Sequence, residues 1–108
     1  MMLNNLTLKM MEYYKGDPKR IQHFTKVHAY AKLIATLEKV SDEMLFMIET
    51  AAIVHDIGIR LCEEKYGKCG GRLQEQEGPA LAKEMLETLG FEQSVTERVC
   101  YLVGHHHT

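Results

Sequence analysis

The sequence predicts an all-α protein, a compact orthogonal bundle of about five helices. Apolar residues recur at intervals of three and four along most of the chain, which is the spacing of one helix face. Helix-start and helix-stop residues bound these stretches, and none shows the strict apolar and polar alternation of a half-buried strand. At 108 residues the chain has the size of one small domain, so we expect a single domain over residues 1–108.

The first two helices have clear boundaries. Apolar residues at positions 3, 6, 10, 13 and 14 predict a short helix from Leu3 to Tyr14. Asp17 is a suitable N-cap for the next helix, with Pro18 at its first position, where the missing N–H costs nothing. This second helix should run to about Glu38 with one apolar face inward, formed by Ile21, Phe24, Val27, His28, Ala31, Ile34 and Ala35.

The third helix should start at Ser41, an N-cap followed by acids that favour the positive end of the helix dipole. It runs into the doublet His55-Asp56, and the lack of charge after Glu49 predicts that this end lies in the core. Residues 58–76 are polar and rich in glycine. They are compatible with a lid or binding loop and equally with an ordinary surface loop.

Two further helices complete the predicted bundle. Gly78-Pro79 should start the fourth helix, and Gly90 should end it from the C′ position. Ser94 should cap the last helix, which ends in Gly104 and three histidines.

The composition excludes several classes of protein. The net charge is −2, with 45% hydrophobic and 26% charged residues, which is ordinary for a globular domain and lacks the basic surplus of a general nucleic-acid binder. No run approaches the roughly 18 apolar residues of a membrane span, and no signal peptide opens the sequence. Three cysteines without a leader favour a reducing compartment. We therefore expect a cytoplasmic protein that binds no membrane.

The doublet His55-Asp56 is the strongest chemical signal in the sequence. Burying an ionised carboxylate beside an imidazole is costly unless both are satisfied, and a divalent metal satisfies both. The alternative is a core histidine beside an aspartate that is hydrogen-bonded to nearby backbone. His23, early in the second helix, and the histidines at 105–107 could aim at the same point. His28 lies about 140° around the helix from His23, which indicates a core histidine or one that supports a ligand.

These blocks resemble the HD-domain family of metal-dependent phosphohydrolases. The segment His23-Phe24-Thr25-Lys26-Val27 resembles the family's first histidine block, Ala51 to Gly58 resembles its His-Asp block, and Val103 to His107 resembles a later histidine block. The ordered set covers most of the chain from about Arg20 onward. The resemblance implies an HD-domain-like helical bundle. In that family a final aspartate lies on a helix after the last histidines. The resemblance therefore implies that this chain, which stops at Thr108, lacks the family's C-terminal portion.

The resemblance also implies a set of site residues. His23, His55 and Asp56 would hold one divalent ion, and His105 or His106, with Glu77, would hold a second ion or complete the first set of ligands. Asp56 could bridge two ions. Lys26 and Arg60 would hold the substrate phosphate, although ordinary surface charge is the favoured interpretation of both, because most lysines and arginines are exposed. The ion would be Mn, Fe, Zn, Mg, Ni or Co, in one or two copies.

The expected activity is hydrolysis of a phosphomonoester or phosphodiester, with a nucleotide or related small phosphate as substrate. The first alternative is a catalytically inactive HD-like module that binds a nucleotide or a protein. The second is an all-α interaction domain whose histidines are incidental core residues. The terminal histidines are also compatible with a purification tag, although only three occur and Thr108 follows them. A homodimer is compatible with each of these functions.

Overall fold

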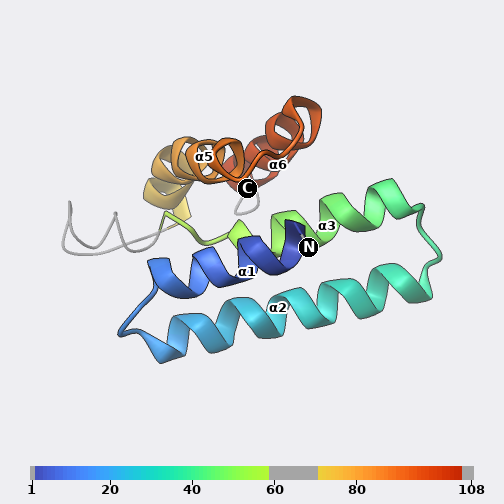
Figure 1. The fold of residues 1–108 in the computed structure, drawn as a ribbon, viewed down its shortest axis with the longest axis horizontal. Coiled ribbons are helices and arrows are strands. Elements are labelled where there is room, and N and C mark those ends of the chain that lie inside the picture. The colour runs from blue at the N-terminus through green and yellow to red at the C-terminus, as the bar shows by residue number, and fades with distance from the viewer. Residues whose placement is uncertain (1, 59–70, 106–108) are drawn as a thin grey trace. The chain divides into compact units, whose positions relative to one another are not determined.

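The computed structural model describes residues 2–58 and 71–105, and all of the helices and strands found there are α-helices (Figure 1). They form two compact units, Met1–Val54 and His55–Thr108. The first unit carries α1 (Met2–Tyr13), α2 (Pro18–Leu37) and α3 (Asp42–Val54), and the second carries α5 (Gly71–Thr88) and α6 (Gln93–His105). The predicted all-α class with about five helices is confirmed. The HD-like arrangement and the single domain over residues 1–108 stay predictions.

Helix α1 buries the face that its apolar spacing predicted. Leu6 and Met10 are fully buried, and Tyr14 follows the last residue of the helix with only 2% of its surface exposed. The ring of Tyr14 lies 6.0 Å from the ring of Phe24 in α2, centroid to centroid. Burying a large apolar side chain contributes about 1.5–3 kcal/mol, so these residues form the core of the first unit.

Helix α2 begins and ends with capping interactions. Oδ1 of Asp17 accepts the backbone N–H of Arg20 at 3.4 Å, and Pro18 occupies the first helical position, as predicted. At the other end, the N–H of Lys39 donates to the carbonyl of Thr36 and that of Val40 to the carbonyl of Ala35. This is the Schellman pattern. It places Lys39 in the left-handed region, with φ 57°.

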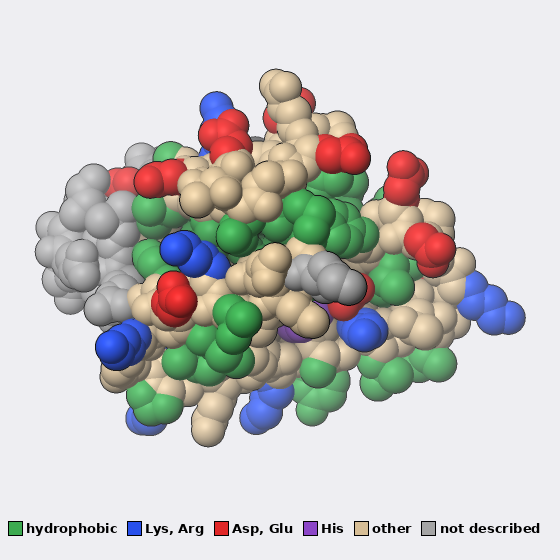
Figure 2. All heavy atoms as spheres, in the orientation of Figure 1, with side chains coloured by type: hydrophobic (Ala, Val, Ile, Leu, Met, Phe, Trp, Pro, Cys, Tyr) green, Lys and Arg blue, Asp and Glu red, His purple; other side chains and the backbone are tan. Residues whose placement is uncertain are grey.

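The inward face of α2 is narrower than predicted. Phe24 and Ala35 are buried, whereas Ile34 is 60% exposed, so its predicted inward position is wrong. Successive helix residues are 100° apart around the axis, and α2 packs against α3 on the side that carries Ala35. Hydrophobic side chains consequently reach the surface along α2 (Figure 2).

Helix α3 is apolar around most of its circumference. Oγ of Ser41 accepts the N–H of Met44 at 3.1 Å, which confirms the predicted cap. Ile53 and Val54 are fully buried at the other end, and Thr50 is buried with its hydroxyl donating to the carbonyl of Phe46 at 2.7 Å. The helix ends at Val54, so His55 and Asp56 lie in the turn that follows it.

The predicted start of a helix at Gly78-Pro79 is wrong, because α5 already begins at Gly71 and contains Pro79 in its interior. Strong helix formers such as Gln and Glu dominate the stretch before Gly78, and they extend the helix across a proline that removes one backbone hydrogen bond. Gly78 has a packing role instead. A Cβ atom at this position would lie 2.8 Å from Cγ1 of Val103, so glycine allows α5 and α6 to approach closely.

The turn between α5 and α6 follows its predicted chemistry. Gly90 has φ 84°, its N–H donates to the carbonyl of Glu87, and the N–H of Phe91 donates to the carbonyl of Leu86, which is again the Schellman pattern. The prediction that Ser94 caps the last helix is wrong, because Ser94 is already the second residue of α6. Helix α6 begins at Gln93, because the carbonyl of Glu92 already accepts the N–H of Thr96 at 2.9 Å.

The second unit has a core of its own. Its buried apolar side chains include Ala82, Leu86, Phe91, Val99 and Val103. Among the described residues of both units, no helix combines the length and apolar character needed to cross a membrane.

Candidate metal centre

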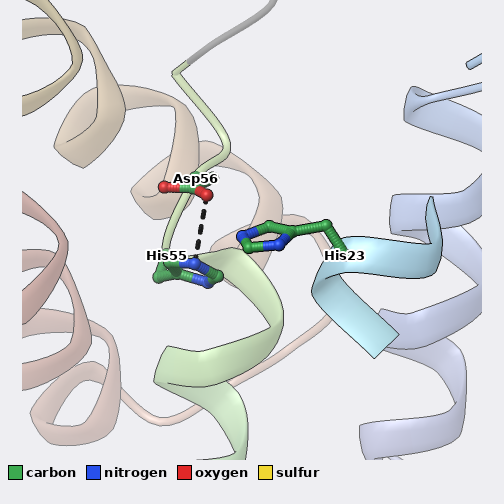
Figure 3. Close-up of side chains that lie close together, drawn as sticks. All are labelled: His23, His55 and Asp56. Atoms are coloured by element: carbon green, nitrogen blue, oxygen red, sulfur yellow. Dashed lines mark ion pairs between the residues drawn. The ribbon is translucent and has the colours of Figure 1, made fainter. Parts of the chain in front are cut away.

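The structure brings three of the predicted metal ligands together. His23 comes from the second turn of α2, and His55 and Asp56 follow the last residue of α3. One ligand atom from each side chain can be chosen so that all three lie within 4.8 Å of one another. Figure 3 shows the imidazole of His23 directed toward the other two side chains. This group is the candidate metal centre.

The doublet is less buried than its apolar surroundings predicted. The side chains of His55 and Asp56 are 19% and 15% exposed, and His23 is exposed. The predicted position deep in the core is therefore wrong. The reason is local, because the doublet lies in a turn and the fully buried positions are its neighbours Val54 and Ile57. A half-buried centre remains accessible to a small ligand.

Within the doublet, Nε2 of His55 lies 3.1 Å from Oδ2 of Asp56 (Figure 3). Ligand atoms bound at about 2.0–2.2 Å to a tetrahedral ion lie roughly 3.4 Å from one another. The His55 and Asp56 atoms lie slightly closer together than this, and the atoms of the whole group lie within 4.8 Å of one another, so binding an ion would require the side chains to adjust. With that adjustment, the spacing fits a first-row divalent ion.

The type of ligand fits as well. Two imidazoles and one carboxylate suit zinc, manganese, iron and related ions, and carboxylate and water ligands alone would suit magnesium better. Catalytic zinc sites typically use three protein ligands and keep a position for water or substrate, whereas structural sites use four. Among the described residues, the group supplies three ligands, two imidazoles and one carboxylate.

The position of His23 depends on how α2 packs against α3. The two helices run antiparallel and side by side in the first unit (Figure 1). Nε2 of His28 lies 2.9 Å from Oε1 of Glu49 and joins them. His28 is five residues after His23, and Glu49 is six residues before His55, so this pair fixes the helices one to two turns from the candidate metal centre.

Sequence reasoning did not identify Glu49 as part of this arrangement. Its carboxylate is buried, with only 6% of the residue exposed. One signal was present, since Glu49 is the only charged residue between Met44 and Val54. A lone charge within an apolar helix is rarely buried without a partner. His28 was placed as a core histidine or one that supports a ligand, which agrees with this contact.

The remaining predicted site residues are not part of the described group. Lys26 is exposed on α2, one turn after His23. Glu77 is half-buried on α5 and is not among the three grouped side chains. His105 is the last residue of α6, but its side chain lies outside the described residues, as do Arg60 and His106. Most of the polar segment 58–76 lies outside them too, although α5 covers its end.

No protein-family model, curated protein or solved structure matches this chain. The resemblance to HD-domain phosphohydrolases therefore rests on the sequence motifs alone. The geometry of the candidate metal centre must carry any functional argument.

Proposed function

We propose that this protein is a metal-dependent phosphohydrolase whose ion is held by His23, His55 and Asp56. The observation that carries the proposal is the convergence of these three side chains, with ligand atoms within 4.8 Å. They come from positions 32 residues apart in the sequence. Two imidazoles and a carboxylate are donors that suit a first-row divalent ion.

When bound, such an ion lowers the pKa of a coordinated water and offsets negative charge on a phosphoryl oxygen. The protein contributes the rest of the chemistry. Asp56 supplies a negative charge beside His55, at 3.1 Å, and so favours a cation over a neutral ligand. Lys26 is exposed one turn from His23, where its ammonium group can bind a phosphate oxygen as a point charge.

The ligands of the centre are accessible from solvent. His23 is exposed, and the side chains of His55 and Asp56 are 19% and 15% exposed. A phosphate ester can reach these atoms without displacing a buried core. A nucleotide or related small phosphate, the class that the HD-domain resemblance implies, is the proposed substrate, as a monoester or a diester. One ion is bound by the described ligands, and a second would need Glu77, His105 or His106.

The decisive test measures metal content and hydrolysis together. Protein purified without a nickel or cobalt column is analysed by elemental mass spectrometry, for the wild type and for Asp56→Ala. The wild type should hold about one ion per chain, and the variant should lose it while keeping its helical circular dichroism. Glu84→Ala is the matched control, because it removes an exposed carboxylate from α5 and should leave the metal in place.

The same samples are then assayed with p-nitrophenyl phosphate, bis-p-nitrophenyl phosphate and a panel of nucleotides. Hydrolysis that follows the metal content across the three proteins supports the proposal. A protein that binds metal and nucleotide but hydrolyses nothing would instead be the inactive binding module. Absence of metal after reloading with manganese, iron and zinc would contradict the metal centre itself.

A further inference from the structure

Helix α2 presents a stripe of large apolar side chains to solvent. Its members are spaced i, i+3, i+4 and i+7, so they lie on one face over two turns. The exposed fractions are 61% for Tyr30, 55% for Leu33, 60% for Ile34 and 71% for Leu37. Figure 2 shows hydrophobic side chains along the lower edge of the molecule, where α2 runs. Single exposed apolar residues are normal, but a contiguous group marks an interaction surface.

Opposite charges flank the two ends of this α2 stripe. On the N-terminal side, residues 17–26 contain Lys19, Arg20 and Lys26 and one acid, Asp17, which pairs with Arg20, a formal charge of +2. On the C-terminal side, residues 38–43 contain three acids and Lys39, a formal charge of −2. The basic residues thus precede the stripe along α2, and the acidic residues lie in the turn after α2 and in the first turn of α3.

A surface with this order is complementary to itself when reversed. In a two-fold symmetric pair, residue i of one copy meets residue j of the other, and j meets i. Antiparallel pairing about a point between Leu33 and Ile34 places Tyr30 opposite Leu37 of the second copy. It also places Lys26 of each copy opposite position 41 of the other, within the acidic segment, whereas Lys19 and Arg20 lie past the end of the other copy's α2. Parallel pairing would instead bring like charges together.

We propose that the α2 stripe is the contact surface between two copies of this chain, paired antiparallel through α2. The area of a two-turn stripe suits an interface below about 1,200 Å² in total, the class of weak and transient contacts. Association with a dissociation constant in the micromolar range is expected. The proposal does not depend on the phosphohydrolase function. An anionic membrane fits less well, since it would repel the acidic segment that adjoins the stripe.

Sedimentation velocity over chain concentrations from 1 μM to 1 mM tests the proposal, with a chelator present to exclude metal bridging. The wild type should change from monomer to dimer across this range. Leu33→Glu should raise the dissociation constant at least tenfold. Leu8→Glu is the matched control, because Leu8 is 60% exposed on α1 and lies off the stripe. Circular dichroism confirms that both variants remain helical.

Charge reversal tests the orientation. Glu38→Lys should raise the dissociation constant severalfold in low salt and much less in 1 M salt, because it places a cation beside the partner's basic segment. Glu84→Lys on α5 should have no such effect. Wild type that stays monomeric at 1 mM, or a Leu33→Glu variant that dimerises as the wild type does, would overturn the proposal. So would a monomer that binds phosphatidylcholine vesicles containing phosphatidylserine through the stripe.

Discussion

Nε2 of His28 lies 2.9 Å from Oε1 of Glu49, and this contact joins α2 to α3 inside the first unit. The side chain of Glu49 is 8% exposed and that of His28 is 23% exposed. A buried polar group is stable only when it has a partner, because its lost hydration must be replaced. The pair therefore fixes the position of one helix on the other, near the turn that carries His55 and Asp56.

We predict that Glu49→Ala lowers the free energy of unfolding by about 1–3 kcal/mol, the cost of leaving a buried hydrogen-bonding group unsatisfied. Urea denaturation of Glu49→Ala, His28→Ala and the double variant measures this cost and the coupling between the two residues. The double variant should lose less than the sum of the single losses. Glu84→Ala, which removes an exposed carboxylate, should stay within about 0.5 kcal/mol of the wild type. Additive losses would mean that the contact contributes little.

Metal binding should separate the ligands from the residues that position them. An ion that binds only the folded state raises its stability, by about 2.7 kcal/mol when its free concentration is 100 times the dissociation constant. The melting temperature of the wild type should therefore rise with added manganese or zinc and fall with a chelator. His23→Ala should abolish this response. His28→Ala should have a lower melting temperature than the wild type, and that temperature should still rise with added metal. Equal rises in all three proteins would contradict the proposed ligands.

The sequence predicted those features that local chemistry decides. The predicted helix ends at Asp17, Ser41 and Gly90 are confirmed. Asp17 and Ser41 accept backbone N–H groups at the starts of α2 and α3, and Gly90 has the positive φ that ends α5. A cap depends on residues only a few positions away, so the local sequence predicts it. The grouping of His23 with His55 and Asp56 was proposed from a family pattern. The helical spacing alone could not establish it, since it fixes which face a residue occupies and not which helices pack together.

The errors arose where packing between helices overrides local preference. The local pattern at Gly78 predicts the start of a helix, but the role of this residue is set by Val103, which is 25 residues away. The apolar pattern of α2 predicts Ile34 on the inner face, yet Ile34 is exposed and only part of that pattern is buried. The contact between Glu49 and His28 was not predicted, because the two residues are 21 positions apart. Each error involves a contact that no short window contains.

Replacing Gly78 tests the close approach of α5 and α6. Glycine to alanine in a helix interior normally stabilises by about 1 kcal/mol. Here the new Cβ would lie 2.8 Å from Cγ1 of Val103, so we expect Gly78→Ala to destabilise by about 1–3 kcal/mol, as overpacking does. Adding Val103→Ala should remove the clash, so the double variant should be more stable than the sum of the single effects. A stabilised Gly78→Ala protein in urea denaturation would contradict the packing role.

The thiol of Cys100 should react slowly near neutral pH. It lines a pocket of about 260 Å³ on α5 and α6, together with Lys83 and Glu87. Burial raises the pKa of Cys100, and of its neighbours Lys83 lowers that pKa while Glu87 raises it. In a protein that carries Cys62→Ser and Cys69→Ser, the rate at which iodoacetamide alkylates Cys100 should thus rise at a higher pH than the rate for a small model thiol. Lys83→Met should shift the rate profile to still higher pH, and Glu87→Gln should shift it lower.

The same pKa shift predicts a loss of stability in alkali. Because the folded state raises the pKa of Cys100, it holds the thiol proton more tightly than the unfolded state does. This contribution is complete below the ordinary thiol pKa and is lost as the pH rises through the raised value. In urea denaturation, wild type should therefore lose more stability between pH 7 and pH 10.5 than Cys100→Ser, which has no thiol. An equal loss would mean that burial does not perturb this group.

The end of α2 offers a direct gain in stability. Lys39 has φ 57°, in the left-handed region that costs roughly 1–2 kcal/mol for a residue with a Cβ atom. Glycine adopts this conformation without steric cost, although it adds entropy to the unfolded chain. Lys39→Gly should therefore raise the free energy of unfolding by about 0.5–1 kcal/mol, measured in urea. Lys39→Ala removes the same charge but keeps the Cβ atom, so it should bring no such gain. Equal stabilisation by both variants would mean that the effect comes from the lost charge and not from the backbone conformation.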